Sequence, residues 1–240
     1  MKITYTAISE VGKRGNNEDA WRVVDLPEKN RWMGVVCDGL GGHAMGEVAS
    51  ETVSDVIADY WEKQSDTPDC KEKVVDACCN ASKELDKRAS QLNHCQMGTT
   101  MVMASIEDRV ATIAHIGDSR CYLIRKGYYD YDEILNDESE NVVYQTADHV
   151  RLDFGWEVVE RCFFSYESAI AEPEVVQLEI QADDRILICS DGFYKSMAPN
   201  ILKARVMDNK SPDEILDVLA FLCEKYGDDN YTAILAIIND

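Results

Sequence analysis

Apolar and polar residues alternate with a period of two along much of this chain, and many of the apolar positions are β-branched. This pattern is typical of half-buried β-strands. Short turns with the letters E-D, G-D and A-D-D separate neighbouring strands, which we expect to pair as antiparallel hairpins. The expected strands lie at residues 2–9, 20–26, 32–37, 98–107, 110–117, 120–126, 142–146, 174–181, 184–190 and 231–238.

Three other segments, residues 46–63, 69–90 and 212–226, carry apolar residues at helical spacing. Thr67-Pro68 supplies a cap and a first-turn proline before the second segment, and S-P-D-E at the start of the third is a capping box. Strands and helices do not alternate as β-α-β units, so we expect an α+β fold of antiparallel sheets covered by helices. With no repeat or linker, residues 1–240 are expected to form one domain.

Composition and charge narrow the choice of partners. The hydrophobic fraction of 45% and charged fraction of 29% are those of a soluble globular protein. A formal net charge of −21 argues against nucleic acid or anionic membranes as partners, because both are bound through clustered Lys and Arg. We find no apolar run long enough to span a bilayer and no signal peptide, and the nine cysteines are irregularly spaced. We therefore expect a cytoplasmic protein with reduced cysteines.

Acidic residues mark the ends of several apolar runs. Asp38 and Asp191 follow such runs, Asp229 precedes one, and Glu18 and Asp19 open another. A lone Asp-Gly is more often a turn than a ligand, but the repeated context favours a shared site. Carboxylates that converge without basic partners repel one another, and a bound Mg²⁺ or Mn²⁺ would remove that conflict. No cysteine–histidine spacing indicates zinc instead.

Seven motifs along the chain resemble, in order, those of the metal-dependent protein phosphatases of the protein phosphatase 2C type, in their bacterial form. The resemblance covers roughly residues 5–238, and its long D-G-x-G-G-H-x-x-G-E-x-A-S block is highly specific. It implies a four-layer fold, a sandwich of two antiparallel sheets with helices on both outer faces. The motifs are G-K-R-G-N-N-E-D-A, V-C-D-G-L-G-G-H-A-M-G-E-V-A-S, M-G-T-T, I-G-D-S-R, T-A-D-H, I-C-S-D-G and D-D-N-Y-T-A-I.

The resemblance also implies a role for each matching residue. Asp38 would bridge two metal ions, with the Gly39 carbonyl as a further ligand. Asp191 and Asp229 would be direct ligands of one ion. Glu18 and Asp19 would hold metal-bound waters, as suits an ion that keeps much of its hydration.

Two further residues are implied by the same match. Asp118 resembles the residue that binds a third ion in several bacterial relatives, and Arg14 resembles the arginine that grips the phosphate. The reaction implied is attack on a phosphate ester by a water that two metal ions activate, without a covalent phosphoenzyme.

The chain departs from the family pattern at two places. Leu40 stands where many eukaryotic relatives have a histidine proposed to protonate the leaving group. A flap around residues 150–172 is shorter and different in sequence, with Asp153 and Glu160 as its candidate ligands of a third ion. Its aromatic cluster, which is expected to be buried rather than to form a lid or partner surface, consists of Trp156, Phe163, Phe164 and Tyr166.

We interpret several polar residues near the motifs as structural. His43, His94 and His149 are expected to be structural or exposed rather than general acids. Thr99 and Thr100 are expected to be core-facing strand residues, and Gly98 to mark a close backbone approach.

The sequence therefore predicts a monomeric Mn²⁺- or Mg²⁺-dependent phosphatase that acts on phosphoserine and phosphothreonine in the protein substrates of a serine/threonine kinase. Two ions are expected, and a third is implied only by Asp118. Two alternatives remain: a non-catalytic regulator that binds a partner through its altered flap, and a hydrolase of small phosphate esters.

Overall fold

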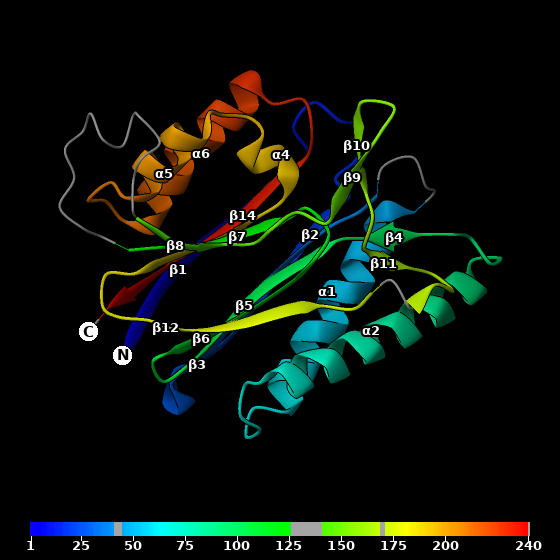
Figure 1. The fold of residues 1–240 in the computed structure, drawn as a ribbon, viewed down its shortest axis with the longest axis horizontal. Coiled ribbons are helices and arrows are strands. Elements are labelled where there is room, and N and C mark those ends of the chain that lie inside the picture. Colours follow the sequence, from blue (N-terminus) through cyan, green and yellow to red (C-terminus); the bar gives the residue numbers. More distant parts are fainter. Residues whose placement is uncertain (41–44, 126–140, 169–170, 240) are drawn as a thin grey trace.

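Two five-stranded antiparallel sheets face each other in the computed structural model, which describes residues 1–40, 45–125, 141–168 and 171–239 (Figure 1). The first sheet has the order β1 (Lys2–Glu10), β14 (Tyr231–Asn239), β13 (Arg185–Cys189), β7 (Arg120–Ile124) and β8 (Val142–Gln145). The second has the order β12 (Glu174–Glu179), β6 (Val110–Ile116), β5 (Met101–Glu107), β3 (Arg31–Asp38) and β2 (Asp19–Leu26).

Helices cover the outer face of each sheet (Figure 1). The second sheet packs against α1 (Gly46–Lys63) and α2 (Lys71–Gln91). The first sheet packs against α4 (Asp191–Tyr194), α5 (Pro199–Val206) and α6 (Pro212–Tyr226). This arrangement confirms the predicted α+β sandwich. Among the helices of the described ranges, none combines the length and the apolar character needed to span a membrane.

Alternation along β3 shows why the layers form. Trp32 and Val36 enter the core between the two sheets, whereas Met33, Val35 and Cys37 pack toward α1 and α2. Both sides of this strand are buried, so it is apolar at almost every position. The α6 helix begins with the predicted capping box, in which Ser211 Oγ accepts from the N–H of Glu214.

Two of the predicted hairpins are wrong. The E-D turn does join β5 to β6, but the chain passes from the second sheet to the first at Gly117-Asp118, between β6 and β7. It crosses again between β12 and β13, at the A-D-D segment. Gly117 has φ +112°, a backbone conformation that L side chains rarely adopt. The first crossing has a consequence for the site, because it places Asp118 between the sheets.

Small elements supplement the two sheets. The predicted strand at 98–107 is divided into β4 (Gly98–Thr99) and β5, and β4 pairs with β11 (Phe163–Phe164). Residues after Asp148 form a hairpin of β9 (Val150–Asp153) and β10 (Trp156–Val159), and a short 3-10 helix, η1, spans Pro27–Lys29. Sequence periodicity did not indicate α4, α5, β9, β10, β11 or η1, all of which have eight residues or fewer.

Candidate metal centre

The predicted acidic residues converge on a cleft of about 610 Å³ at one end of the sandwich. Asp38 ends β3, Asp191 begins α4 directly after β13, and Asp229 lies just before β14. Asp118 comes from the crossing between the sheets. Of the predicted site residues, Arg14, Glu18, Asp38, Gly39, Asp118, Asp191 and Asp229 line the cleft, and Asp19 lies buried behind it.

Backbone contacts hold Asp38 in place. The N–H of Thr100 donates to the Asp38 carbonyl at 2.8 Å, and the Asp38 N–H donates to Thr100 Oγ1 at 3.1 Å. Thr99 Oγ1 donates to the same carbonyl at 2.9 Å. Both threonines are buried, as predicted, but their contact with Asp38 was not foreseen. These bonds use only the Asp38 backbone, so they hold the residue in place without engaging its carboxyl group, which faces Asp191.

Burial and mutual repulsion disturb the carboxylates of the cleft. Burial, followed by the charges of Asp19, Asp191 and Asp118, raises the pKa of Asp38 well above its usual range. Burial raises the pKa of Asp19 to about 7, and burial together with Asp191 raises the pKa of Asp118 to about 6. A hard divalent cation would stabilise the ionised forms. The donor set therefore fits Mn²⁺ or Mg²⁺.

The surroundings of Asp19 also fit a bound divalent cation. Its Oδ2 accepts from Ser190 Oγ at 2.8 Å, whereas its Oδ1 is buried and has no hydrogen-bond partner among the described residues. A buried acceptor without a donor is costly. A water held by a metal ion would supply that donor, which is the role that the resemblance implies for Asp19.

Gly39 and Gly46 allow the start of α1 to pack closely against Glu18 and against the end of β3. A Cβ on Gly46 would lie 2.7 Å from Glu18 Oε2, and one on Gly39 would collide with the Gly46 carbonyl. The Glu18 N–H also donates to Asn230 Oδ1 at 2.9 Å. Asn230 in turn donates to the carbonyls of Val11 and Asn16, so this residue, which the sequence reasoning missed, fixes the loop that carries Arg14 and Glu18.

Two basic residues pair with the carboxylates of the cleft, whereas the sequence interpretation assumed that the carboxylates converge without basic partners. Arg14 Nη2 lies 2.7 Å from Asp229 Oδ2 at the mouth of the cleft. Lys195 Nζ lies 2.8 Å from Asp191 Oδ2 and 3.5 Å from Asp118 Oδ2. The spacing of Lys195, four residues after Asp191 at the start of a helix, was the signal that could have found it.

The flap differs from the sequence prediction in its candidate metal ligands and in the burial of its aromatic residues. Of its residues, Glu157 and Val159 line the cleft, whereas Asp153 and Glu160 are exposed and do not, so neither candidate flap ligand is placed to bind an ion there. Phe163 is fully buried, as predicted. The prediction is wrong for Trp156, which is 75% exposed on the β9–β10 hairpin, and for Tyr166, which is 46% exposed.

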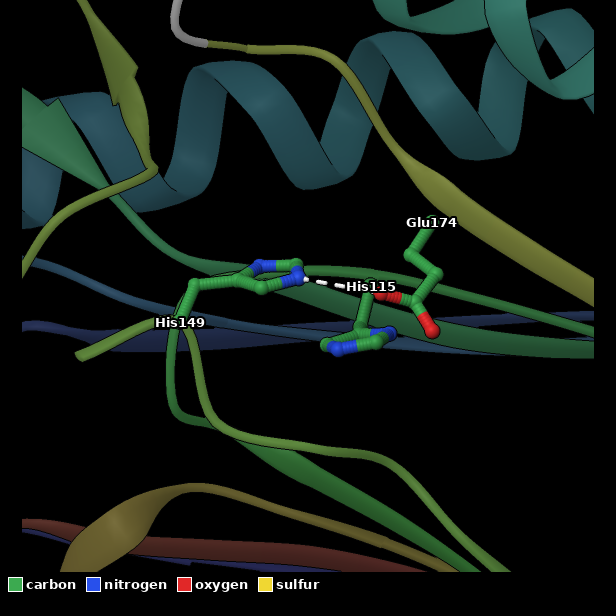
Figure 2. Close-up of side chains that lie close together, drawn as sticks. All are labelled: His115, His149 and Glu174. Atoms are coloured by element: carbon green, nitrogen blue, oxygen red, sulfur yellow. Dashed lines mark hydrogen bonds and ion pairs between the residues drawn. The ribbon is translucent and has the colours of Figure 1, made fainter.

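His115, His149 and Glu174 form a second cluster with ligand-type atoms within 4.8 Å of one another (Figure 2). Three features oppose a metal here. Arg161 Nη1 lies 3.1 Å from His149 Nε2, His115 Nε2 faces the Ala147 carbonyl at 2.7 Å, and the two rings stack at 4.4 Å and 10°. Lone pairs lie in the ring planes, so stacked rings do not direct them at a common point.

The described histidines agree with a structural interpretation. Burial lowers the pKa of His115 and of His149, so both rings are neutral contacts between β6 and the start of the flap. His94 Nδ1 lies 3.0 Å from the Tyr166 hydroxyl on the surface. His43 falls outside the described residues.

Comparison with known proteins places the chain in a family. The protein phosphatase 2C family model matches residues 9–226. The serine/threonine phosphatase stp of Listeria welshimeri is 26% identical over 92% of this chain and 90% of its own length, and the protein phosphatase PhpP of Streptococcus pneumoniae is 26% identical over 99% and 98%. The crystal structure of the catalytic domain of the serine threonine protein phosphatase PstP in complex with 2 manganese ions has a TM-score of 0.78 at 26% identity, covering 99% of both chains. The chain thus belongs to the protein phosphatase 2C family of metal-dependent serine/threonine phosphatases.

Proposed function

We propose that this chain removes phosphate from phosphoserine and phosphothreonine in cytoplasmic proteins and opposes a serine/threonine kinase. It acts as a monomer, with one catalytic domain over residues 1–240 and a divergent flap around residues 150–172. The observation that carries the proposal is the convergence of Asp38, Asp191 and Asp229 from three separate segments of the chain on one cleft with Arg14 at its mouth.

Each acidic residue has a defined task in this proposal. The Asp38 carboxylate and the Gly39 carbonyl would hold two Mn²⁺ or Mg²⁺ ions together with Asp191 and Asp229, while Glu18 and Asp19 would orient their waters. When bound, such a pair of ions lowers the pKa of a water and neutralises charge on a phosphate ester. The PstP structure, described with 2 manganese ions, supports this stoichiometry.

Arg14 is the phosphate-binding residue of the proposal. Its side chain is 55% exposed, and one nitrogen donates to Asp229 at 2.7 Å. A guanidinium has five N–H donors in a planar fork, so it can hold Asp229 and still present donors to phosphate oxygens.

The cysteines nearest to the cleft do not offer a second mechanism. Cys37 and Cys189 are fully buried, and burial raises the pKa of both thiols well above its ordinary value. A neutral, inaccessible thiol is a poor nucleophile. This supports direct attack by water rather than a cysteinyl-phosphate intermediate.

Phosphate release from a phosphothreonine peptide tests the proposal, with Mn²⁺ added in one arm and EDTA in the other. Nucleotides and sugar phosphates serve as competing substrate classes. Turnover of the peptide that requires Mn²⁺ is the expected result. Preference for the small esters would identify the chain as a hydrolase of small phosphate esters instead. Failure to hydrolyse any of these substrates with Mn²⁺ bound would favour the non-catalytic regulator.

A further inference from the structure

The Lys195 ammonium lies among three carboxylates at the side of the cleft. Its Nζ is 2.8 Å from Asp191 Oδ2, 3.5 Å from Asp118 Oδ2 and 4.0 Å from Glu157 Oε2. These partners come from α4, from the crossing between the sheets and from the flap strand β10. The arrangement therefore joins three segments far apart in the sequence through one cation.

Neighbouring contacts keep this ammonium in place. The Tyr194 hydroxyl donates to the Asp118 carbonyl at 3.1 Å, which ties α4 to the crossing segment. Arg120, the other cation close by, stacks on Tyr194 and is occupied by Asp148 through two bonds of 2.7 and 2.8 Å. In the described part of the chain, Lys195 is thus the cation that faces the Asp118 carboxylate.

Asp118 resembles the ligand of a third ion in bacterial relatives, but its surroundings here differ from those of a metal ligand. A divalent ion bound between Asp118 and Asp191 would compete with Lys195 Nζ for the Oδ2 atoms of both carboxylates. It would also lie close to the Lys195 ammonium, and like charges at such a distance repel.

We propose that the Lys195 ammonium takes the position between Asp118 and Asp191 that a third metal ion would need. The enzyme then binds two divalent ions, and Lys195 is a positioning residue that neutralises Asp118 and orients Asp191. This proposal rests on the two-ion centre of the proposed function. In this proposal Lys195 has no role in binding substrate phosphate, because its ammonium donates to Asp191 Oδ2 and faces the carboxylates of Asp118 and Glu157.

Calorimetric titration of the metal-free protein with Mn²⁺ tests the proposal, with bound manganese measured independently by elemental analysis after gel filtration. Wild type should bind two ions per chain. Lys195→Met keeps much of the side-chain length but removes the charge, and it should gain a third, weaker ion. Lys195→Arg keeps the charge and should remain at two.

Two further variants make the result specific. Asp118→Asn added to Lys195→Met should remove the extra ion and leave two. Lys63→Met removes another lysine that pairs with a carboxylate four residues away, at 3.1 Å on the exposed face of α1, and should bind two ions like wild type. Should Lys195→Met fail to fold, as judged by circular dichroism, Lys195→Gln takes its place.

Three ions on wild type, or no additional ion on the folded uncharged variants, would overturn the proposal. The proposed function fails in a different way. Wild type that binds two Mn²⁺ ions yet hydrolyses no phosphopeptide would leave the role of Lys195 intact and refute the phosphatase activity.

Discussion

Asp19 and Asp38 lie directly opposite each other as the first pair of the β2–β3 ladder, at the end of the sheet that forms the cleft. Opposed like charges on neighbouring strands destabilise a sheet. Both residues have a pKa raised chiefly by burial, and each is raised further by surrounding carboxylates. The fold therefore holds these residues in a costly arrangement that a divalent cation relieves.

Asp38→Asn should abolish turnover, with a loss in kcat of at least ~10³-fold, because it removes the proposed bridge between two ions. The fold should persist, since Thr99 and Thr100 contact only the backbone of residue 38. Without metal, the variant should be more stable than wild type because one crowded carboxylate is gone. Kinetics and thermal melts in EDTA and in Mn²⁺ measure these effects, and substantial residual turnover would contradict the two-ion mechanism.

Arg14→Ala should raise KM for a phosphopeptide by ~10- to 100-fold with a smaller effect on kcat, because it removes phosphate binding. Arg14→Lys should recover only part of the loss, since an ammonium lacks the planar fork. Arg22→Ala is the matched control, because Arg22 also pairs with an exposed aspartate, Asp55, at 2.6 Å on the helical face. Steady-state kinetics in which Arg14→Ala and Arg22→Ala behave alike would place the phosphate clamp elsewhere.

The metal-free protein should lose stability as pH rises from about 4 to 8. Asp19, with a folded pKa of about 7 against 3.8 ordinarily, binds more protons in the folded than in the unfolded state throughout that window. Each unit of pKa difference corresponds to ~1.4 kcal/mol. Denaturation in EDTA across this range measures the slope. Asp19→Asn should make the slope shallower, and Asp38 and Asp118, whose pKa values are also raised, should keep part of it. Excess Mn²⁺ should reverse the slope because ionised carboxylates bind the ion better. A slope unchanged in Asp19→Asn would show that other groups cause it.

The acidic half of the site could be predicted from the sequence because Asp38, Asp191 and Asp229 each sit where an apolar run begins or ends. The strand ends that carry these residues lie at the same end of the sandwich, so their side chains line one cleft. Lys195 was missed because α4 has only four residues, so the sequence did not indicate the helix that would have made its spacing from Asp191 meaningful. Lys195 directly follows this helix and pairs with Asp118 and Asp191.

Which sheet a strand joins could not be predicted in the same way. The strands β6 and β7 are buried on both faces along most of their length, so alternation gives no sign that the chain changes sheets between them. The turn letters G-D were compatible with a hairpin and with a crossing. Only packing of the whole sandwich distinguishes the two, and it brings Asp118 into the cleft.

Gly98→Ala should destabilise the protein by ~1–3 kcal/mol, the cost of overpacking a filled site. A Cβ there would lie 2.6 Å from the Phe164 ring and 2.9 Å from the Phe163 carbonyl, and a backbone atom cannot move aside cheaply. Gly15→Ala serves as the control, since its Cβ would meet no atom within 4 Å. Urea denaturation compares the two variants, and equal stability would mean that the β4–β11 pair tolerates displacement.

The two ends of the flap should respond very differently to truncation. Phe163→Ala removes a fully buried ring from the core that also contains Met97 and Leu85, and it should cost ~3–5 kcal/mol. Trp156→Ala removes a side chain that is 75% exposed on the β9–β10 hairpin, and it should change stability by less than ~0.5 kcal/mol. Urea denaturation of both variants in EDTA measures the contrast independently of metal binding. A large loss for Trp156→Ala would mean that the hairpin is packed against the body of the protein in solution, and the flap would then contribute to the fold as well as to the rim of the cleft.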